Sequence, residues 1–143
     1  MPPANLRLED LPVPIRLRLS ALWASLMFCY VYGDYFGLYV PGKVMEMNAG
    51  RMSSLGQLST GTHVAVAMMM AVPSLMVAFS LLLPPVFRWL HAALAVAYAG
   101  IMVLTMAGGA TAFYFLFGVI EIALSLAILW SAIRWPRVAQ AKV

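Results

Sequence analysis

Long apolar stretches alternate with short polar ones along the whole chain. Four stretches contain no Lys, Arg, Asp or Glu: residues 20–33, 63–86, 89–120 and 122–133. A helix that crosses the hydrocarbon core of a bilayer needs about 20 mainly apolar residues, at about 1.5 Å of rise for each. The pattern therefore predicts an all-α transmembrane protein with four spanning helices, at residues 17–40, 62–83, 89–107 and 111–133.

The connections between the predicted spans determine how the spans are arranged. Residues 84–88 and 108–110 form connections so short that the spans they join must run antiparallel and lie side by side. We therefore expect residues 17–135 to form one domain, a transmembrane four-helix bundle. A proline-containing leader at 1–16 precedes it, and a tail at 136–143 follows it.

The only long connection, residues 41–61, is rich in methionine and leucine and is too apolar for a free loop. We expect it to lie on the membrane or to cap the bundle. A short helical turn or two, closed by Gly50, is predicted within it. The sequence leaves open whether this connection is a lid, an interfacial helix or a surface for a protein partner.

Composition and charge support a membrane protein. Hydrophobic residues make up 64% of the chain and charged residues only 10%, too few to cover a soluble domain of this size. The outer side has only Lys43 and Arg51. Seven basic residues fall on the side of both termini: Arg7, Arg16, Arg18, Arg88, Arg134, Arg137 and Lys142. The positive-inside rule therefore predicts two cytoplasmic termini. We expect the lipid bilayer as a partner and no nucleic acid.

Glu121 is the most unusual residue, because it lies in the middle of the fourth apolar run. A charged carboxylate at this depth costs roughly 2.5 to 3.5 kcal/mol on insertion scales. Gly118, Ser125 and Ala132 share its helix face, and small residues mark packing faces in membranes. Glu121 is therefore predicted to face protein. Two interpretations stay open: a proton or cation site, or a hydrogen bond that locks helix four to a neighbour.

Asp34 is the second unusual charge, about 9 Å inside the outer end of the first predicted span at about 1.5 Å per residue. Tyr30 lies one helical turn earlier and is placed to donate a hydrogen bond to it. Tyr114 lies on the Glu121 face, toward the outside. The pattern predicts a polar cluster of these residues that opens outward. The sequence fits a second interpretation equally well, in which Asp34 only forms a structural hydrogen bond.

The second span carries a stripe of small residues that predicts another packing face: Ala67, Ala71, Ser74 and Ala78. His63 falls at the outer end of this stripe. Two roles stay open for it: a relay in the polar cluster, or an interfacial side chain exposed to solvent. Pro73 predicts a kink, because it removes one backbone donor. Ser74 is expected to help satisfy the freed carbonyl.

The sequence predicts no cofactor, no metal and no catalytic residue. Methionines near His63 suggest a Cu(I) site, but the 11 methionines are spread over the whole chain and are ordinary gap-fillers in apolar cores. The single cysteine excludes a disulfide framework, and no glycine motif for phosphate is present. His91 is expected at the level of the head groups, beside Arg88 and Trp89.

Three stretches carry a resemblance to a known family. They are ALWASLM at 21–27 with GDYF at 33–36, PSLM at 73–76 with the following Pro84-Pro85, and FGVIE at 117–121 with Trp135-Pro136. The chain resembles a family of small bacterial four-span integral membrane proteins of unknown function, over residues 6–137. The resemblance implies the bacterial plasma (inner) membrane and no activity. Small multidrug transporters are similar in size, but their membrane glutamate lies in the first helix.

The leading hypothesis is proton-linked transport or ligand binding at Glu121, with Asp34 and Tyr30 as the outer access and His63 as a relay. Four helices enclose little volume, so transport favours a homo-oligomer. The alternative is a structural or accessory membrane subunit without a transported substrate. A membrane enzyme that acts on a lipid or a quinone is the third hypothesis, with the least support.

Overall fold

The computed structural model describes residues 12–52, 56–57, 59–109 and 111–136. It is all-helical apart from one minimal antiparallel hairpin, in which Arg51 pairs with Gln57. In chain order the elements are α1 (Ile15–Gly37), α2 (Lys43–Asn48), β1 (Arg51–Met52), β2 (Gly56–Gln57), α3 (Thr60–Leu82), the 3-10 helix η2 (Pro85–Phe87), α4 (Arg88–Ala107) and α5 (Ala112–Ile133).

Local sequence signals explain where these helices begin and end. The side chain of Ser59 accepts a hydrogen bond from the backbone N–H of Thr62 and so caps the start of α3. Pro84 and Pro85 stop α3, because the residue before a proline is biased away from helical backbone. The predicted helical turn in the long connection is confirmed as α2. Gly50 follows it with φ 67°, a conformation that glycine adopts without strain.

Three helical segments are long and apolar enough to cross a membrane: Thr60–Leu82, Pro85–Ala107 and Ala112–Ile133. The structure thereby confirms three of the four predicted spans by length and composition. α1 has the same length as α3, 23 residues, but it carries Arg16, Arg18 and Asp34 and is not among them. Its membrane crossing and the orientation of the chain stay predictions.

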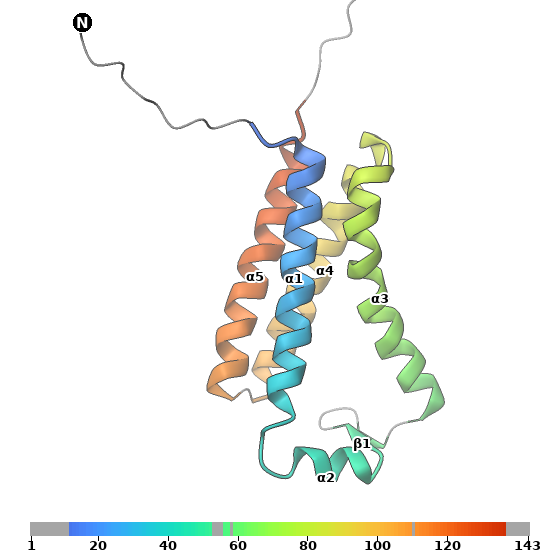
Figure 1. Cartoon of the computed structure of the whole chain (residues 1–143), viewed down its shortest axis with the longest axis vertical. Helices are drawn as coiled ribbons and strands as arrows, with labels where there is room; N and C mark the ends of the chain where they lie inside the picture. Colours follow the sequence, from blue (N-terminus) through green and yellow to red (C-terminus); the bar gives the residue numbers. More distant parts are fainter. Residues whose placement is uncertain (1–11, 53–55, 58, 110, 137–143) are drawn as a thin grey trace, which may run out of the picture.

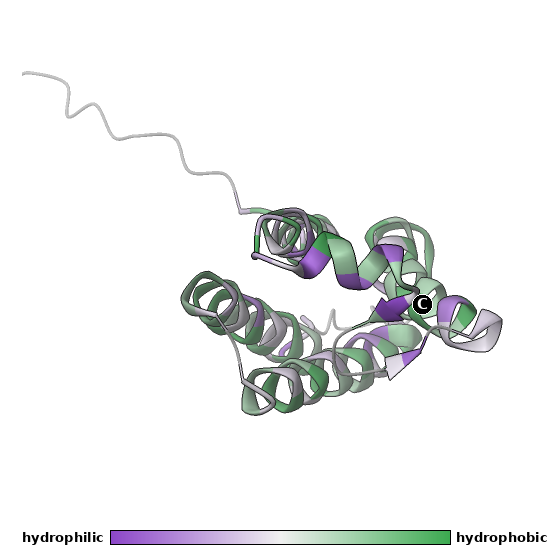
Figure 2. Ribbon diagram, turned by 90° about the horizontal axis from the view of Figure 1, so that it is seen from below, coloured by the Kyte–Doolittle hydropathy of each residue, from purple (hydrophilic) through white to green (hydrophobic). Residues whose placement is uncertain are grey.

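The four long helices pack in the order α4, α5, α1, α3, with α1 between α5 and α3 (Figure 1). The start of α1 and the end of α5 lie together at one end of the molecule, the terminal end. α2 and β1 lie at the opposite end, the loop end. Viewed from the loop end, the long helices are largely hydrophobic (Figure 2).

α3 diverges from α1 toward the loop end (Figure 1). Its buried residues Pro73, Met76 and Ser80 all lie in its second half, nearer the terminal end. The packing of α3 is therefore close near the terminal end of the molecule and more open near the loop end.

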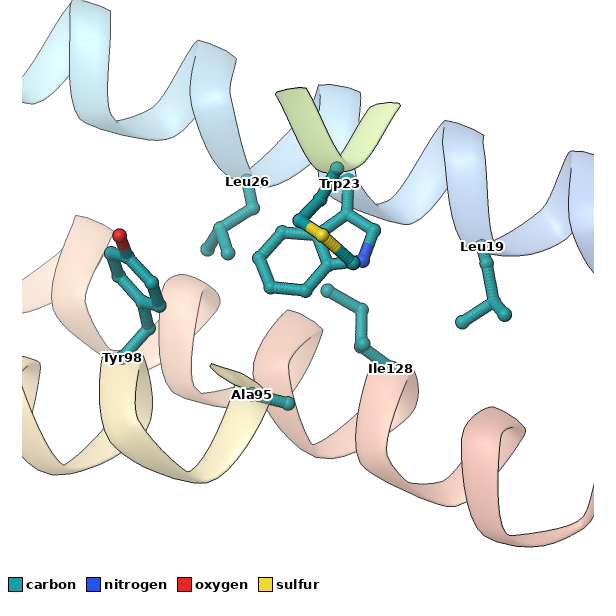
Figure 3. Close-up of a cluster of buried hydrophobic side chains, with 7 residues drawn as sticks. Leu19, Trp23, Leu26, Ala95, Tyr98 and Ile128 are labelled. Carbon is teal, nitrogen blue, oxygen red and sulfur yellow. The ribbon is translucent and has the colours of Figure 1, made fainter. Parts of the chain in front are cut away.

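The closely packed region is centred on Trp23, which is fully buried. Its ring meets the ring of Tyr98 edge-on, with the centroids 6.3 Å apart. Around it gather side chains from all four long helices, most of them labelled in Figure 3: Leu19, Leu26, Met76, Ala95, Tyr98 and Ile128. We call these six residues, together with Trp23, the Trp23 cluster. Dispersion contacts of this kind hold membrane helices together.

Pro73 frees the carbonyl of Met69, four residues earlier, from its helical hydrogen bond. The hydroxyl of Tyr98, on α4, donates to that carbonyl oxygen. The prediction that Ser74 would help is wrong, because Ser74 Oγ donates instead to the carbonyl of Met70, at 2.9 Å. The defect in α3 is thus repaired by another helix, and the repair ties α3 to α4.

Candidate functional site

Glu121 lies on the inner face of α5 and is only 2% exposed. Within the described part of the chain its Oε2 atom has no hydrogen-bond partner. The same holds for Oγ of Ser125, which is 1% exposed. Residues four apart on a helix lie on the same face, about 5 to 6 Å apart at Cβ. Two unsatisfied oxygens therefore lie one turn apart, in a protein interior where buried polar groups are ordinarily paired.

Asp34, on α1, is the second carboxylate near Glu121. The Asp34 and Glu121 carboxylates interact electrostatically, although Asp34 itself is exposed. The phenols of Tyr30 and Tyr114 and the thiol of Cys29 also lie within range of the Glu121 charge. Of the predicted site residues, the structure thus places Asp34, Tyr30 and Tyr114 within electrostatic range of Glu121. We call these four residues with Ser125 the carboxylate site. The predicted hydrogen bond from Tyr30 to Asp34 is not formed within the described residues.

A cation that the sequence did not single out completes this group. Lys43, at the start of α2, interacts electrostatically with Asp34. The connection between α1 and α3 therefore contributes a positive charge to the loop end of the site. The chain turn at Pro41-Gly42 places α2 there, with Gly42 at φ 84°.

α5 packs closely on α4 one helical turn before Glu121. A Cβ atom added to Gly118, one turn before Glu121, would lie 2.5 Å from Sδ of Met106 and 3.1 Å from Sδ of Met102. Only glycine allows the two helices to approach this closely without moving a methionine. Gly118, Ser125 and Ala132 are all buried along this face.

His63 does not join the carboxylate site. It is exposed in the first turns of α3, and its Nδ1 lies 3.2 Å from the carbonyl oxygen of Ser59. The small residues predicted to share a packing face with His63 do not form the buried face of α3. Ala71 is partly buried, and the exposed ones are Ala67, Ser74 and Ala78. α3 contacts only α1 extensively, so most of its circumference faces outward.

A family model matches residues 15–142, which include all four long helices and every residue of the carboxylate site. The chain belongs to DUF6326, a family of unknown function. No curated protein and no solved structure matches it. The predicted membership of a family of unknown function is confirmed, while the bacterial membrane location stays a prediction.

One buried polar pair of this DUF6326 chain was not predicted from the sequence. Nε1 of Trp23 donates to Nδ1 of His91 at 3.0 Å, and His91 is buried within the protein, with 2% of its surface exposed. The spacing of residues in α4 could have predicted the burial of His91. At intervals of three or four residues, His91 is followed by Ala95, Tyr98 and Met102, which form the buried face of the helix. Since Nδ1 accepts, the neutral ring carries its proton on Nε2.

The groups of the carboxylate site are suited to proton chemistry. No group of three or more His, Cys, Asp or Glu residues that would hold a metal occurs within the described residues of this DUF6326 chain. The carboxylate site combines two carboxyls, two phenols and one hydroxyl. A protonated carboxyl both donates and accepts hydrogen bonds, and phenols and hydroxyls do the same. Such a set of groups is suited to holding a proton.

Proposed function

We propose that this chain is a small membrane protein that carries protons across the bilayer, with Glu121 as the proton-binding group. The observation that supports this most directly is the buried Oε2 atom of Glu121, which lacks a hydrogen-bond partner among the described residues beside an equally unpaired Ser125 hydroxyl. Carboxyl groups at membrane depth mark ion and proton pathways more often than packing contacts.

The balance of charge at the site supports a bound proton. Glu121 and Asp34 together carry two negative charges when both are ionised, and Lys43 supplies one positive charge near Asp34. One negative charge then remains in a largely apolar environment, where an uncompensated charge is costly. A single proton on the pair of carboxyls removes this charge.

The route from the loop end follows the burial of the side chains. Asp34 is exposed and close to Lys43, whereas Glu121 is deeper and buried. Protons would enter at Asp34 and reach Glu121 between the phenols of Tyr30 and Tyr114. The ring of Tyr30 lies 6.2 Å from that of Tyr98, a member of the Trp23 cluster. Passage to the terminal end therefore requires that cluster to open, and α3, packed mainly through its second half, is the helix best placed to move.

A second candidate is a structural role, in which Glu121 only locks α5 to its neighbours. The close approach of α5 to α4 at Gly118 favours it, because that contact places Glu121 in a helix interface. The two candidates differ in what a neutral isostere does. If Glu121 carries protons, Glu121→Gln abolishes proton flux. If Glu121 only forms a structural hydrogen bond, glutamine can form it too, and the stability of the protein is unchanged.

Proton flux into liposomes tests the proposal. Purified protein is reconstituted around a pH-sensitive dye, and an imposed pH gradient is allowed to decay. We expect wild-type protein and Glu46→Gln, a control for an exposed carboxylate on α2, to dissipate the gradient equally fast. Glu121→Gln should fall to the rate of protein-free vesicles. Wild-type flux in Glu121→Gln, or no flux above empty vesicles in the wild type, would contradict the proposal.

A further inference from the structure

A second polar feature lies at the terminal end, away from the carboxylate site. A cavity of about 200 Å³ is open between the start of α1 and the end of α5. Its polar lining comes from Arg18 on α1 and from Ser131 and Arg134 at the end of α5, with the indole of Trp130 beside them. None of the described residues that line this cavity carries a carboxylate.

Among the residues that the structure describes, neither Arg18 nor Arg134 donates a side-chain hydrogen bond. Cζ of Arg134 lies over the Trp130 ring, 3.9 Å from its centroid. Stacking engages the face of a guanidinium and leaves the N–H groups at its edge free. Arg18 forms no hydrogen bond or ion pair within residues 12–52, 56–57, 59–109 and 111–136. Arg16, by contrast, donates to the carbonyl of Leu81 at 3.0 Å and is thereby occupied.

The position of the cavity along α5 matches the level of lipid head groups. α5 is one of the segments apolar enough to span a membrane, and it ends at Ile133, immediately before Arg134. Tryptophan is enriched at membrane surfaces, and basic pockets between helices there bind anionic head groups. Trp130 and Arg134 therefore lie where the phosphates of a surrounding bilayer would be.

The chemistry of the lining selects an anion with several oxygen acceptors. Two guanidinium forks and a nearby hydroxyl suit a phosphate, which accepts paired hydrogen bonds from arginine. A choline head group fits less well, because the indole face that would attract its ammonium already holds Arg134. We propose that this cavity binds the phosphodiester of an anionic phospholipid, and this proposal is independent of the proton chemistry at Glu121.

Lipid titration of the delipidated, detergent-solubilised chain tests the proposal, with native mass spectrometry as the readout. Phosphatidylglycerol is compared with phosphatidylcholine of the same acyl chains. We expect phosphatidylglycerol to bind more tightly, and Arg18→Gln and Arg134→Gln each to weaken its binding about tenfold or more, as loss of a charged hydrogen-bond donor does. Arg88→Gln is the matched control. Arg88 lies over the Trp89 ring at 5.0 Å but does not line the cavity, so this variant should bind like the wild type.

Three results would overturn the proposal. Equal losses in all three variants would show a general effect of surface charge, and equal binding of both lipids would exclude selection of an anionic head group. Displacement of the lipid by millimolar glycerophosphate would reassign the cavity to a free phosphate.

If the glutamine variants do not fold, Arg18→Lys and Arg134→Lys take their place, because lysine keeps the charge but loses the paired donors of the guanidinium group. Unchanged phosphatidylglycerol binding in both would also contradict the proposal.

Discussion

Two regions of the molecule differ in whether their buried polar groups form hydrogen bonds. In the Trp23 cluster and around it, the indole of Trp23 donates to His91, Tyr98 donates to Met69, and Ser20 donates to the carbonyl of Val77 at 2.9 Å. In the carboxylate site, the described structure leaves oxygens of Glu121 and Ser125 unpaired. Both regions are built from the same helices, so the difference lies in which side chains the helices present to one another.

This difference separates a region selected for stability from one that stability alone does not explain. An unpaired buried polar group costs about 1 to 3 kcal/mol, whereas a paired one is close to neutral or favourable. A chain that satisfies its polar groups near Trp23 but not near Glu121 carries a local cost. Sites that bind a proton or a ligand are where such costs are ordinarily found.

The largest expected effect is in the Trp23 cluster. Trp23→Ala should destabilise the protein in detergent by about 3 kcal/mol or more, because it removes a fully buried ring and leaves His91 without its donor. Denaturant titration followed by circular dichroism measures this. Leu126→Ala is the control, since Leu126 is 55% exposed. Equal destabilisation by both variants would show that the Trp23 cluster is not the core.

A change in the opposite direction is expected in the carboxylate site. Glu121→Met should stabilise the protein by about 1 to 3 kcal/mol, because it replaces an unsatisfied buried carboxyl with an apolar side chain of similar length. The same variant should lose proton flux. The structural alternative expects the reverse sign, since a lock would be broken, so a clear loss of stability would support the alternative.

A smaller effect should follow from the repair of α3. Tyr98→Phe removes the donor to the carbonyl freed by Pro73 and should cost about 1 kcal/mol, in the range found for hydrogen bonds between membrane helices. Hydrogen exchange near Met69 should increase with it. Tyr114→Phe is a matched control, because the Tyr114 hydroxyl makes no hydrogen bond within the described residues. Equal effects of the two variants would exclude a special role for Tyr98.

The smallest effect distinguishes two glycines in the membrane helices. Gly100 has open space around it, so Gly100→Ala should stabilise α4 by up to about 1 kcal/mol through helix propensity. Gly118→Ala should lose that gain, because Met106 must move away from the new methyl group. The difference in denaturation midpoint between the two variants is the measured quantity. No difference would mean that α4 and α5 are not held at close approach.

The sequence predicted several features that depend on one helix at a time, although the stripe of small residues on α3 is not its buried face. Runs of apolar residues gave three of the spans, Pro84-Pro85 gave the end of α3, and Gly50 gave the end of α2, because each signal acts on its own backbone. Glu121 was placed on a protein-facing side by the small residues of its own helix, and it is buried in the structure.

Contacts that depend on how one helix is rotated and placed relative to another element were not predicted. Tyr98 reaches the carbonyl of Met69 from another helix, and Lys43 reaches Asp34 from a connection whose path the sequence left open. The head-group level that Arg88 and Trp89 predict for His91 stays a prediction, but the contact of His91 with Trp23 was not predicted. The helix face of His91, which continues through Ala95, turns it inward to Trp23.

The most direct test of the central claim is the protonation of Glu121 itself. Infrared difference spectroscopy in nanodiscs follows the carboxyl band of the wild type as pH is changed, with Glu121→Gln to assign the band and Glu46→Gln as a control. A proton carrier must exchange its proton with water, so the Glu121 band should appear and disappear reversibly between about pH 5 and 9, the range in which functional carboxyls are tuned. A band that stays unchanged throughout that range would contradict the account and support a structural carboxyl.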